Sequence, residues 1–162
     1  MLPEKEKFYE DATQKLLKTI DKMQMDKLSR MRAKNLVLLF RDSFKLPDIK
    51  QKTFKDDYEC FSYASDGFCR VSSINFALMM GGMPEWRLKY IDNLWTYGPH
   101  HYLMHVPSQT ILDLTYDQYT NAGLEIPYHL GKTIDFDFKK DESAVRFAQA
   151  LGLNSLIAKQ KD

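Results

Sequence analysis

Apolar side chains recur at helical spacing through roughly the first 44 residues. Residues 4 to about 24 form one amphipathic pattern, and a second runs from Asp26, a candidate N-cap, to about Phe44. The first pattern directs five apolar residues toward a core: Phe8, Leu16, Leu17, Ile20 and Met23. The run LVLLF at 36–40 indicates deep burial of the second helix, and LPD at 46–48 ends it.

A third helical pattern, at residues 66–82, carries a cysteine near its start. Asp66 is the predicted N-cap, because its carboxylate can accept from the free amides of the first turn. Cys69 then takes the third helical position, where the helix dipole favours a thiolate. Gly81 and Gly82 supply the stop. A plain packing role also fits Cys69, since a cysteine on an apolar helix is usually a small buried hydrophobic residue.

The second half of the chain carries the patterns of strands. Residues 86–91 are strand-like, and the apolar runs 100–106 and 110–115, separated by PSQ, predict a β-hairpin. Residues 134–138 predict an edge strand, and residues 142–151 predict a helix that Gly152 ends. No internal repeat interrupts the chain. We therefore expect a single α+β domain over residues 1–162.

The length of the hairpin loop decides which histidine faces Asp113. With a three-residue loop, His101 and Asp113 become diagonal neighbours on one face of the sheet. A two-residue loop shifts the pairing of the strands by one residue and puts Asp113 on the face of His100 and Tyr102. The first geometry favours His101, and His105, which shares that face beside the turn, is the weaker candidate.

Composition and charge narrow the classes of function. Hydrophobic residues make up 44% and aromatic residues 13% of the chain, which excludes a disordered protein. The 23 basic and 22 acidic residues leave a net charge of +1, so there is no electrostatic case for nucleic acid or anionic lipid. No apolar run reaches the roughly 18 residues of a membrane span, and the N-terminus has no signal-peptide h-region. We expect a cytoplasmic protein with no nucleic-acid or membrane partner, while secretion as an effector stays open.

The two cysteines, Cys60 and Cys69, form neither a disulfide framework nor a zinc-ligand pair, because their spacing is too wide and no second pair follows. A reduced compartment fits this usage. His100, His101 and His105 form a partial ligand set, but strand geometry puts His100 on the opposite face. We therefore expect no metal and no cofactor.

Three residue types suit thiol catalysis when they converge. Cys69 supplies a nucleophile, a histidine at the start of a strand can take its proton, and Asp113 can fix the histidine tautomer. Tyr63, in the loop before the helix, and His100 are candidates for an oxyanion or substrate contact, and the Cys69 amide at the helix start is another oxyanion donor. An aromatic residue at position 63 also fits simple packing.

Three stretches resemble the papain-like cysteine hydrolases, and more closely their transglutaminase-like branch. They are GFCRVS at 67–72, HYL at 101–103 and ILDLTYDQY at 111–119, the last of which is similar to an ILDLTADQF run in that branch. By this resemblance Cys69 matches the nucleophile, His101 the base and Asp113 the orienting acid. The resemblance covers roughly residues 58–120 and implies a core in which the cysteine-bearing helix packs on an antiparallel sheet. The helical N-terminal part at 1–48, expected from the apolar pattern, lies outside it.

The chain also departs from the family. It lacks the CGSCW run of papain-type proteases and the tryptophan-rich nucleophile motif of animal transglutaminases, and Leu103 stands where tryptophan is commoner. The resemblance implies a hydrolase of amide bonds, either a protein glutamine deamidase or a peptidase, that acts on a protein or peptide through a thioester. Alternatives on the same fold are a transglutaminase or acyltransferase and an inactive binding or inhibitory module.

Overall fold

The computed structural model describes residues 3–55, 63–92, 98–153 and 155. Within them the chain has a mixed α+β fold, with a four-stranded antiparallel sheet in the order β3-β2-β1-β4. The α-helices are α1 (Pro3–Asp21), α2 (Lys27–Phe44), α3 (Pro47–Phe54), α4 (Cys69–Met79), α5 (Asp117–Thr120) and α6 (Glu142–Ala150). The strands are β1 (Trp86–Ile91), β2 (His100–His105), β3 (Thr110–Leu112) and β4 (Lys132–Thr133), and the 3₁₀ helices are η2 (Tyr128–Leu130) and η3 (Phe138–Lys140).

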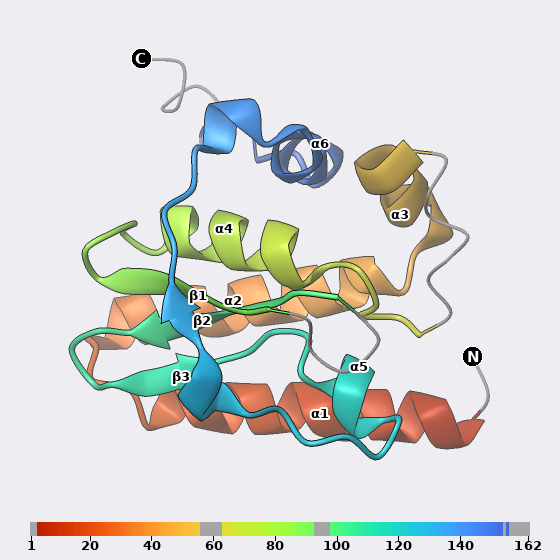
Figure 1. The fold of residues 1–162 in the computed structure, drawn as a ribbon, viewed down its shortest axis with the longest axis horizontal. Helices are drawn as coiled ribbons and strands as arrows, with labels where there is room; N and C mark the ends of the chain where they lie inside the picture. The colour runs from red at the N-terminus through yellow and green to blue at the C-terminus, as the bar shows by residue number, and fades with distance from the viewer. Residues whose placement is uncertain (1–2, 56–62, 93–97, 154, 156–162) are drawn as a thin grey trace.

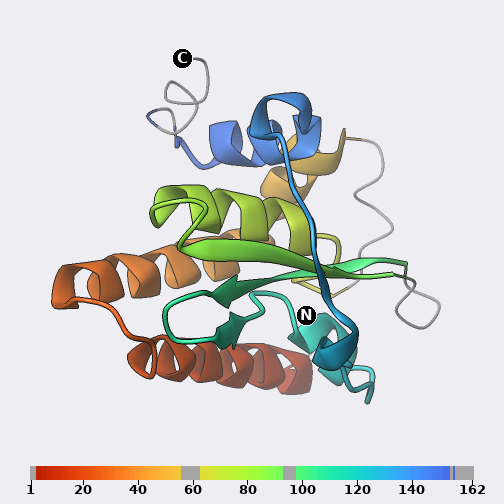
Figure 2. The same ribbon diagram turned by 60° about the vertical axis from the view of Figure 1, so that its left-hand side comes forward.

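The central helix α4 lies between the sheet and a helical layer. It packs against β1 and β2 on one side and against α6 on the other, and α3 packs beside α6 (Figures 1 and 2). The N-terminal helices α1 and α2 pack against each other, and α1 also contacts the edge strand β3. The first residue of α4 and the first residues of β2 can therefore meet at one end of the sheet.

The two N-terminal helices follow the predicted pattern closely. Asp26 is the N-cap of α2, as predicted, and its carboxylate accepts from the Ser29 amide at 2.7 Å. The placement of Phe8 in the core is wrong, because the buried face of α1 begins at Tyr9 and leaves the Phe8 side chain 38% exposed. Of the helices in the described ranges, none has both the length and the apolar character needed to cross a bilayer.

Pro47 begins a helix rather than only ending one. The predicted end of α2 is confirmed, but residues 47–54 form α3, which the sequence pattern did not indicate. Proline suits the first helical position, because its fixed φ fits the helix and its missing amide has no partner to lose there. The result is that α3 brings Phe54 to the core.

Phe68, the residue before Cys69, is fully buried among aromatic rings. Its ring stacks on Phe44 of α2 at 4.4 Å and lies 5.0 Å from Phe54 and 5.7 Å from Phe147, measured between ring centroids. A buried phenylalanine side chain contributes about 1.5–3 kcal/mol. This packing fixes the point at which α4 begins and therefore fixes the backbone of Cys69.

The predicted N-cap of α4 is wrong. The helix begins at Cys69, not two residues earlier, because Gly67 has φ +81° and interrupts helical geometry. The Asp66 carboxylate instead accepts from the amide of Tyr63 at 2.9 Å, which closes the turn before the helix. Cys69 is therefore the first residue of α4 and not the third.

Segments near the C-terminus agree in part with the prediction. The helix predicted at 142–151 is confirmed as α6, and Asp141 caps it by accepting from the Ala144 amide. The edge strand predicted at 134–138 is wrong: the strand is β4, at Lys132–Thr133. The predicted stop of α4 at Gly81 and Gly82 is confirmed, since the helix ends at Met79 and both glycines have positive φ.

The hairpin register differs from the favoured one. His105 pairs with Thr110, so residues 106–109 form a four-residue connection in which Gln109 has φ +53°. A loop with an even number of residues shifts the pairing of the strands by one residue, so that alternate side chains of β2 exchange faces relative to those of β3. Asp113, which follows β3, therefore lies on the side of His100, and the expected pairing of Asp113 with His101 is wrong.

Candidate active site

Cys69 stands at the N-terminus of an 11-residue helix with its side chain partly exposed. The helix offers no carbonyl to the amide of its own first residue. That amide and the positive end of the helix dipole therefore lie beside the sulfur, where they can stabilise a negative charge. Cys60, the other cysteine, lies outside the described residues.

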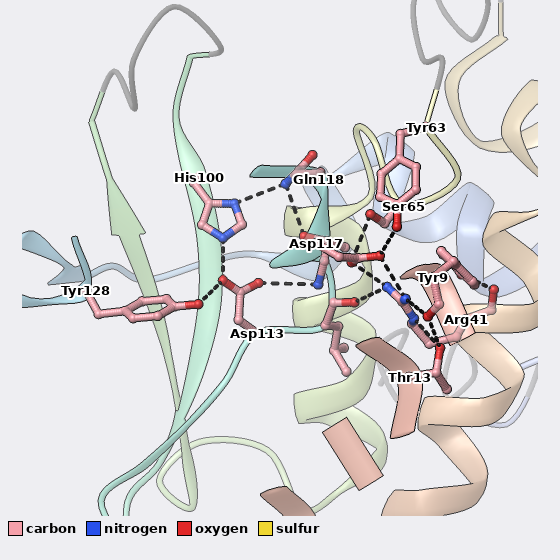
Figure 3. Close-up of polar contacts among 12 residues, drawn as sticks. Tyr9, Thr13, Arg41, Tyr63, Ser65, His100, Asp113, Asp117, Gln118 and Tyr128 are labelled. Carbon is pink, nitrogen blue, oxygen red and sulfur yellow. Dashed lines mark hydrogen bonds and ion pairs between the residues drawn. The ribbon is translucent and has the colours of Figure 1, made fainter. Parts of the chain in front are cut away.

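Two adjacent histidines open strand β2 and differ in their partners. His101 Nδ1 lies 3.8 Å from Cys69 Sγ, and its ring packs near Tyr90 on the neighbouring strand. His100 is fully buried, and its Nε2 lies 2.6 Å from Asp113 Oδ2 (Figure 3). His100 also interacts with the Cys69 thiol. The carboxylate is therefore bound by His100, while the direct contact with the thiol is made by His101.

Asp113 is buried, and three donors hold its carboxylate. Oδ2 accepts from His100 and also from the Tyr128 hydroxyl at 2.8 Å, while Oδ1 accepts from the Thr115 amide at 3.3 Å (Figure 3). Burial and the charge of Asp113 raise the pKa of Tyr128, so that its hydroxyl stays a donor. Such a set of donors fixes the orientation of the carboxylate toward His100.

The thiol and His100 favour each other's charged form. Burial raises the pKa of the Cys69 thiol, but hydrogen bonds and charge from His100 and His101 outweigh it and lower that pKa to about 5. Burial also opposes the charge on His100, whereas the charge and hydrogen bond of Asp113, and then those of Cys69, raise its pKa to about 10. These opposite shifts favour a thiolate beside an imidazolium, the active form of a nucleophilic cysteine.

The predicted oxyanion donor Tyr63 belongs to a different cluster. Its hydroxyl donates to Asp117 Oδ2 at 2.8 Å, so its one proton is used there. Asp117 also makes a two-pronged ion pair with Arg41, at 2.7 and 2.9 Å, and accepts from Ser65 (Figure 3). Arg41 donates in addition to the carbonyl of Leu114. This cluster joins α2, the turn before Cys69 and the segment after Asp113.

Sequence reasoning missed Gln118, Tyr128 and the Arg41–Asp117 pair. One signal was present: Arg41 continues the buried stripe of α2 that includes Val37 and Phe40, and a charged residue on such a stripe needs a buried partner. Asp117 is that partner, 76 residues away. No local pattern points to Tyr128, whose contact with Asp113 depends on the tertiary fold.

The described part of the chain contains no cluster of three or more histidine, cysteine, aspartate or glutamate side chains arranged to hold a metal ion. Comparison of the chain with protein-family models, with curated proteins and with solved structures finds no match. The chemistry of the site therefore rests on its own geometry.

Proposed function

We propose that this chain is a thiol-dependent hydrolase of amide bonds, with Cys69 as nucleophile, His100 as general acid and base, and Asp113 as the orienting acid. The observations that carry the proposal are the Asp113–His100 contact of 2.6 Å and the position of both histidines at the start of β2 beside Cys69, whose Sγ lies 3.8 Å from His101 Nδ1. The helix-borne cysteine packed on an antiparallel sheet also supports a papain-like core of the transglutaminase-like type.

The reaction divides into two steps. The Cys69 thiolate attacks the carbonyl carbon, and the resulting oxyanion receives the amide hydrogen of Cys69. His100 then gives its Nδ1 proton to the leaving nitrogen, which departs as ammonia or an amine and leaves a thioester on the sulfur. In the second step neutral His100 takes a proton from water, hydroxide adds to the thioester, and the thiolate leaves as a carboxylic acid forms.

Asp113 favours His100 over His101 as the base. A catalytic imidazole needs one nitrogen for the thiol and the other for a group that fixes its tautomer. His100 has the second of these partners, because its Nε2 is bound to Asp113. His101, which resemblance assigned as the base, contacts the thiol through Nδ1 at 3.8 Å and contributes to the low thiol pKa as a second partner.

The substrate that we propose is a glutamine side chain or a peptide bond of a protein or peptide. The partly exposed thiol on a helix terminus suits a group presented from outside. The same three residues would serve a transglutaminase or acyltransferase, since the two activities differ only in whether water or an amine resolves the thioester.

An activated ester tests the chemistry without knowledge of the substrate. p-Nitrophenyl acetate acylates a competent thiol whatever its specificity, so the protein should release a rapid burst of nitrophenolate equal to its own concentration. Intact mass should then locate one acetyl group on Cys69 and follow its loss. Cys69→Ala should abolish the burst and His100→Asn should slow both phases. A folded protein that gives no burst contradicts the proposal.

A second assay identifies the acceptor. The protein is incubated with unfolded casein, with and without a primary amine, and the intact mass of the casein is measured. A gain of one dalton means deamidation, fragments mean peptide hydrolysis, and a gain equal to the amine less ammonia means acyl transfer. Cys69→Ala is the control for each outcome.

A further inference from the structure

Gln118 contacts the one ring nitrogen of His100 that Asp113 leaves free. The Gln118 amide nitrogen lies 3.2 Å from His100 Nδ1 and also 3.2 Å from the hydroxyl oxygen of Thr115 (Figure 3). The other ring nitrogen, Nε2, is bound to Asp113. Gln118 therefore touches the nitrogen that, in the proposed reaction, exchanges a proton with the thiol.

The backbone that presents Gln118 is firmly held. Gln118 follows Asp117, whose carboxylate is bound by Arg41 in the buried two-pronged ion pair. Thr115 is fully buried, and its amide donates to Asp113 Oδ1. The Gln118 amide, the Thr115 hydroxyl and the Asp113 carboxylate thus have fixed positions around one side of His100.

The two protonation states of His100 require opposite ends of the Gln118 amide. In neutral His100, Nε2–H donates to Asp113 and Nδ1 accepts, so the Gln118 NH₂ group is the right partner. In the imidazolium, Nδ1 carries a proton, and an N–H group facing it would set donor against donor. Half a turn of the amide brings its carbonyl oxygen to Nδ1 instead.

The Thr115 hydroxyl can follow such a turn. A hydroxyl both donates and accepts, so it accepts from the Gln118 NH₂ group in one state and donates to the Gln118 oxygen in the other. A valine at this position would offer neither. Gln118 and Thr115 are uncharged, so their effect on His100 comes through hydrogen bonds.

We propose that Gln118 is a positioning residue whose side-chain amide reverses when His100 gains or loses a proton, with the Thr115 hydroxyl turning in step. His100 Nδ1 then keeps a partner in both states, and the ring keeps its orientation between Asp113 and Gln118 through both halves of the reaction. This inference rests on the proposed function, because it takes His100 as the base.

The surroundings of His100 hold other titratable groups that any pH dependence includes. They are Cys69 on α4, His101 and Tyr102 on β2, Asp113 after β3, Tyr119 on α5 and Tyr128 on η2. Variants at Gln118 and Thr115 leave all of these side chains in place. A change in the titration of His100 in such variants therefore reports on the amide and the hydroxyl.

Nuclear magnetic resonance of the full-length protein tests the reversal directly. The ring nitrogens of His100 and the side-chain carbonyl carbon of Gln118 are followed against pH, since neither signal depends on an exchangeable proton. We expect both to change with one shared midpoint. Thr115→Ser, which keeps the hydroxyl, should behave as the wild type, whereas Thr115→Val should reduce the Gln118 response. A Gln118 carbon that does not follow His100 overturns the inference.

Charge at position 118 gives a second test. A carboxylate only accepts, so Gln118→Glu should hold the proton on His100 and move its midpoint up by about one pH unit or more. Gln118→Leu, which offers no partner, should move the midpoint by less and broaden the ring signals. Midpoints unchanged in both folded variants would overturn the inference. Failure of the proposed function looks different: the Cys69 thiol then titrates at its ordinary value in the wild type.

Discussion

Asp113 Oδ2 lies 2.6 Å from His100 Nε2, although His101 is the histidine whose Nδ1 lies 3.8 Å from the Cys69 sulfur. Adjacent residues of a strand point to opposite faces, so one carboxylate cannot serve both rings equally. The contact with Asp113 therefore distinguishes the two histidines, because His100 is bound to the carboxylate and His101 lies beside the thiol. The two roles can be separated by experiment.

His100→Asn and His101→Asn should differ in their effect on the thiol. Loss of His100 removes the larger of the two histidine contributions and breaks the connection to Asp113, so Cys69 should react with iodoacetamide at pH 6 at least about tenfold more slowly. His101→Asn should have a smaller effect. The exposed His129 supplies a control, and His129→Gln should leave the rate unchanged. The reverse order of effects would make His101 the base.

Asp113→Asn should leave the fold in place and impair the proposed chemistry. The amide cannot stabilise the imidazolium as a carboxylate does, so the pKa of His100 should fall and that of Cys69 should rise. General acid–base catalysis is worth about 10²–10⁴ in rate, and the deacylation of acetylated Cys69 should slow by an amount in that range. A rate within twofold of the wild type would exclude Asp113 from the reaction.

Stability should show a plateau against pH that belongs to this pair. From about pH 5 to 6.5 the folded Cys69 is ionised and the unfolded one is not, while His100 is charged in both states, so stability rises with pH. From pH 6.5 to 9.0 the unfolded state binds one more proton than the folded state at Cys69 and one fewer at His100, so the two effects on stability cancel. Toward pH 10 the folded His100 loses its proton, and its contribution to the free energy of unfolding is lost, so stability falls.

Urea unfolding of the wild type and of Cys69→Ser across this range measures the effect. The variant lacks the Cys69 contribution, which grows between the folded pKa of about 5 and the ordinary value of 9.0, so its stability relative to the wild type should fall from about pH 5 to pH 9. A constant difference between the two proteins from pH 5 to 9 would contradict the ionised pair.

The Arg41–Asp117 pair should be worth far more than a surface ion pair. Both side chains are at most 1% exposed, so Asp117→Asn leaves a buried guanidinium without its counter-charge and should cost about 3–5 kcal/mol. Asp48→Asn, which removes an exposed i,i+4 pair with Lys52, should cost less than about 0.5 kcal/mol. Chemical denaturation of the two variants makes the comparison. Equal costs would show that the buried pair is not a structural anchor.

Local patterns in the sequence predict several elements of this fold well. Helix α2 and its cap at Asp26 were predicted because both depend on nearby residues alone. The start of α4 was not, because a single glycine, Gly67, takes a positive φ that the apolar pattern does not register. Helix α3 was missed because Pro47 serves as a start as well as a stop.

The candidate site was predictable in composition but not in its pairing. Cys69 and Asp113 were identified from residue type and spacing, whereas the choice between His100 and His101 depended on one residue of loop length. Tyr128 and Gln118 reach the site through contacts 15 and 18 residues along the chain, and no periodicity records them. The sequence therefore indicates which residue types belong to this site, but it does not indicate the strand register that pairs them.

The ionisation of Cys69 in the folded protein tests the central claim most directly. In a Cys60→Ser variant, which leaves one thiol, the rate of alkylation by iodoacetamide is measured against pH under native conditions. The thiolate paired with His100 predicts a midpoint at about pH 5 that moves upward in His100→Asn. A midpoint near the ordinary value of 9.0, unaffected by that substitution, would contradict the account.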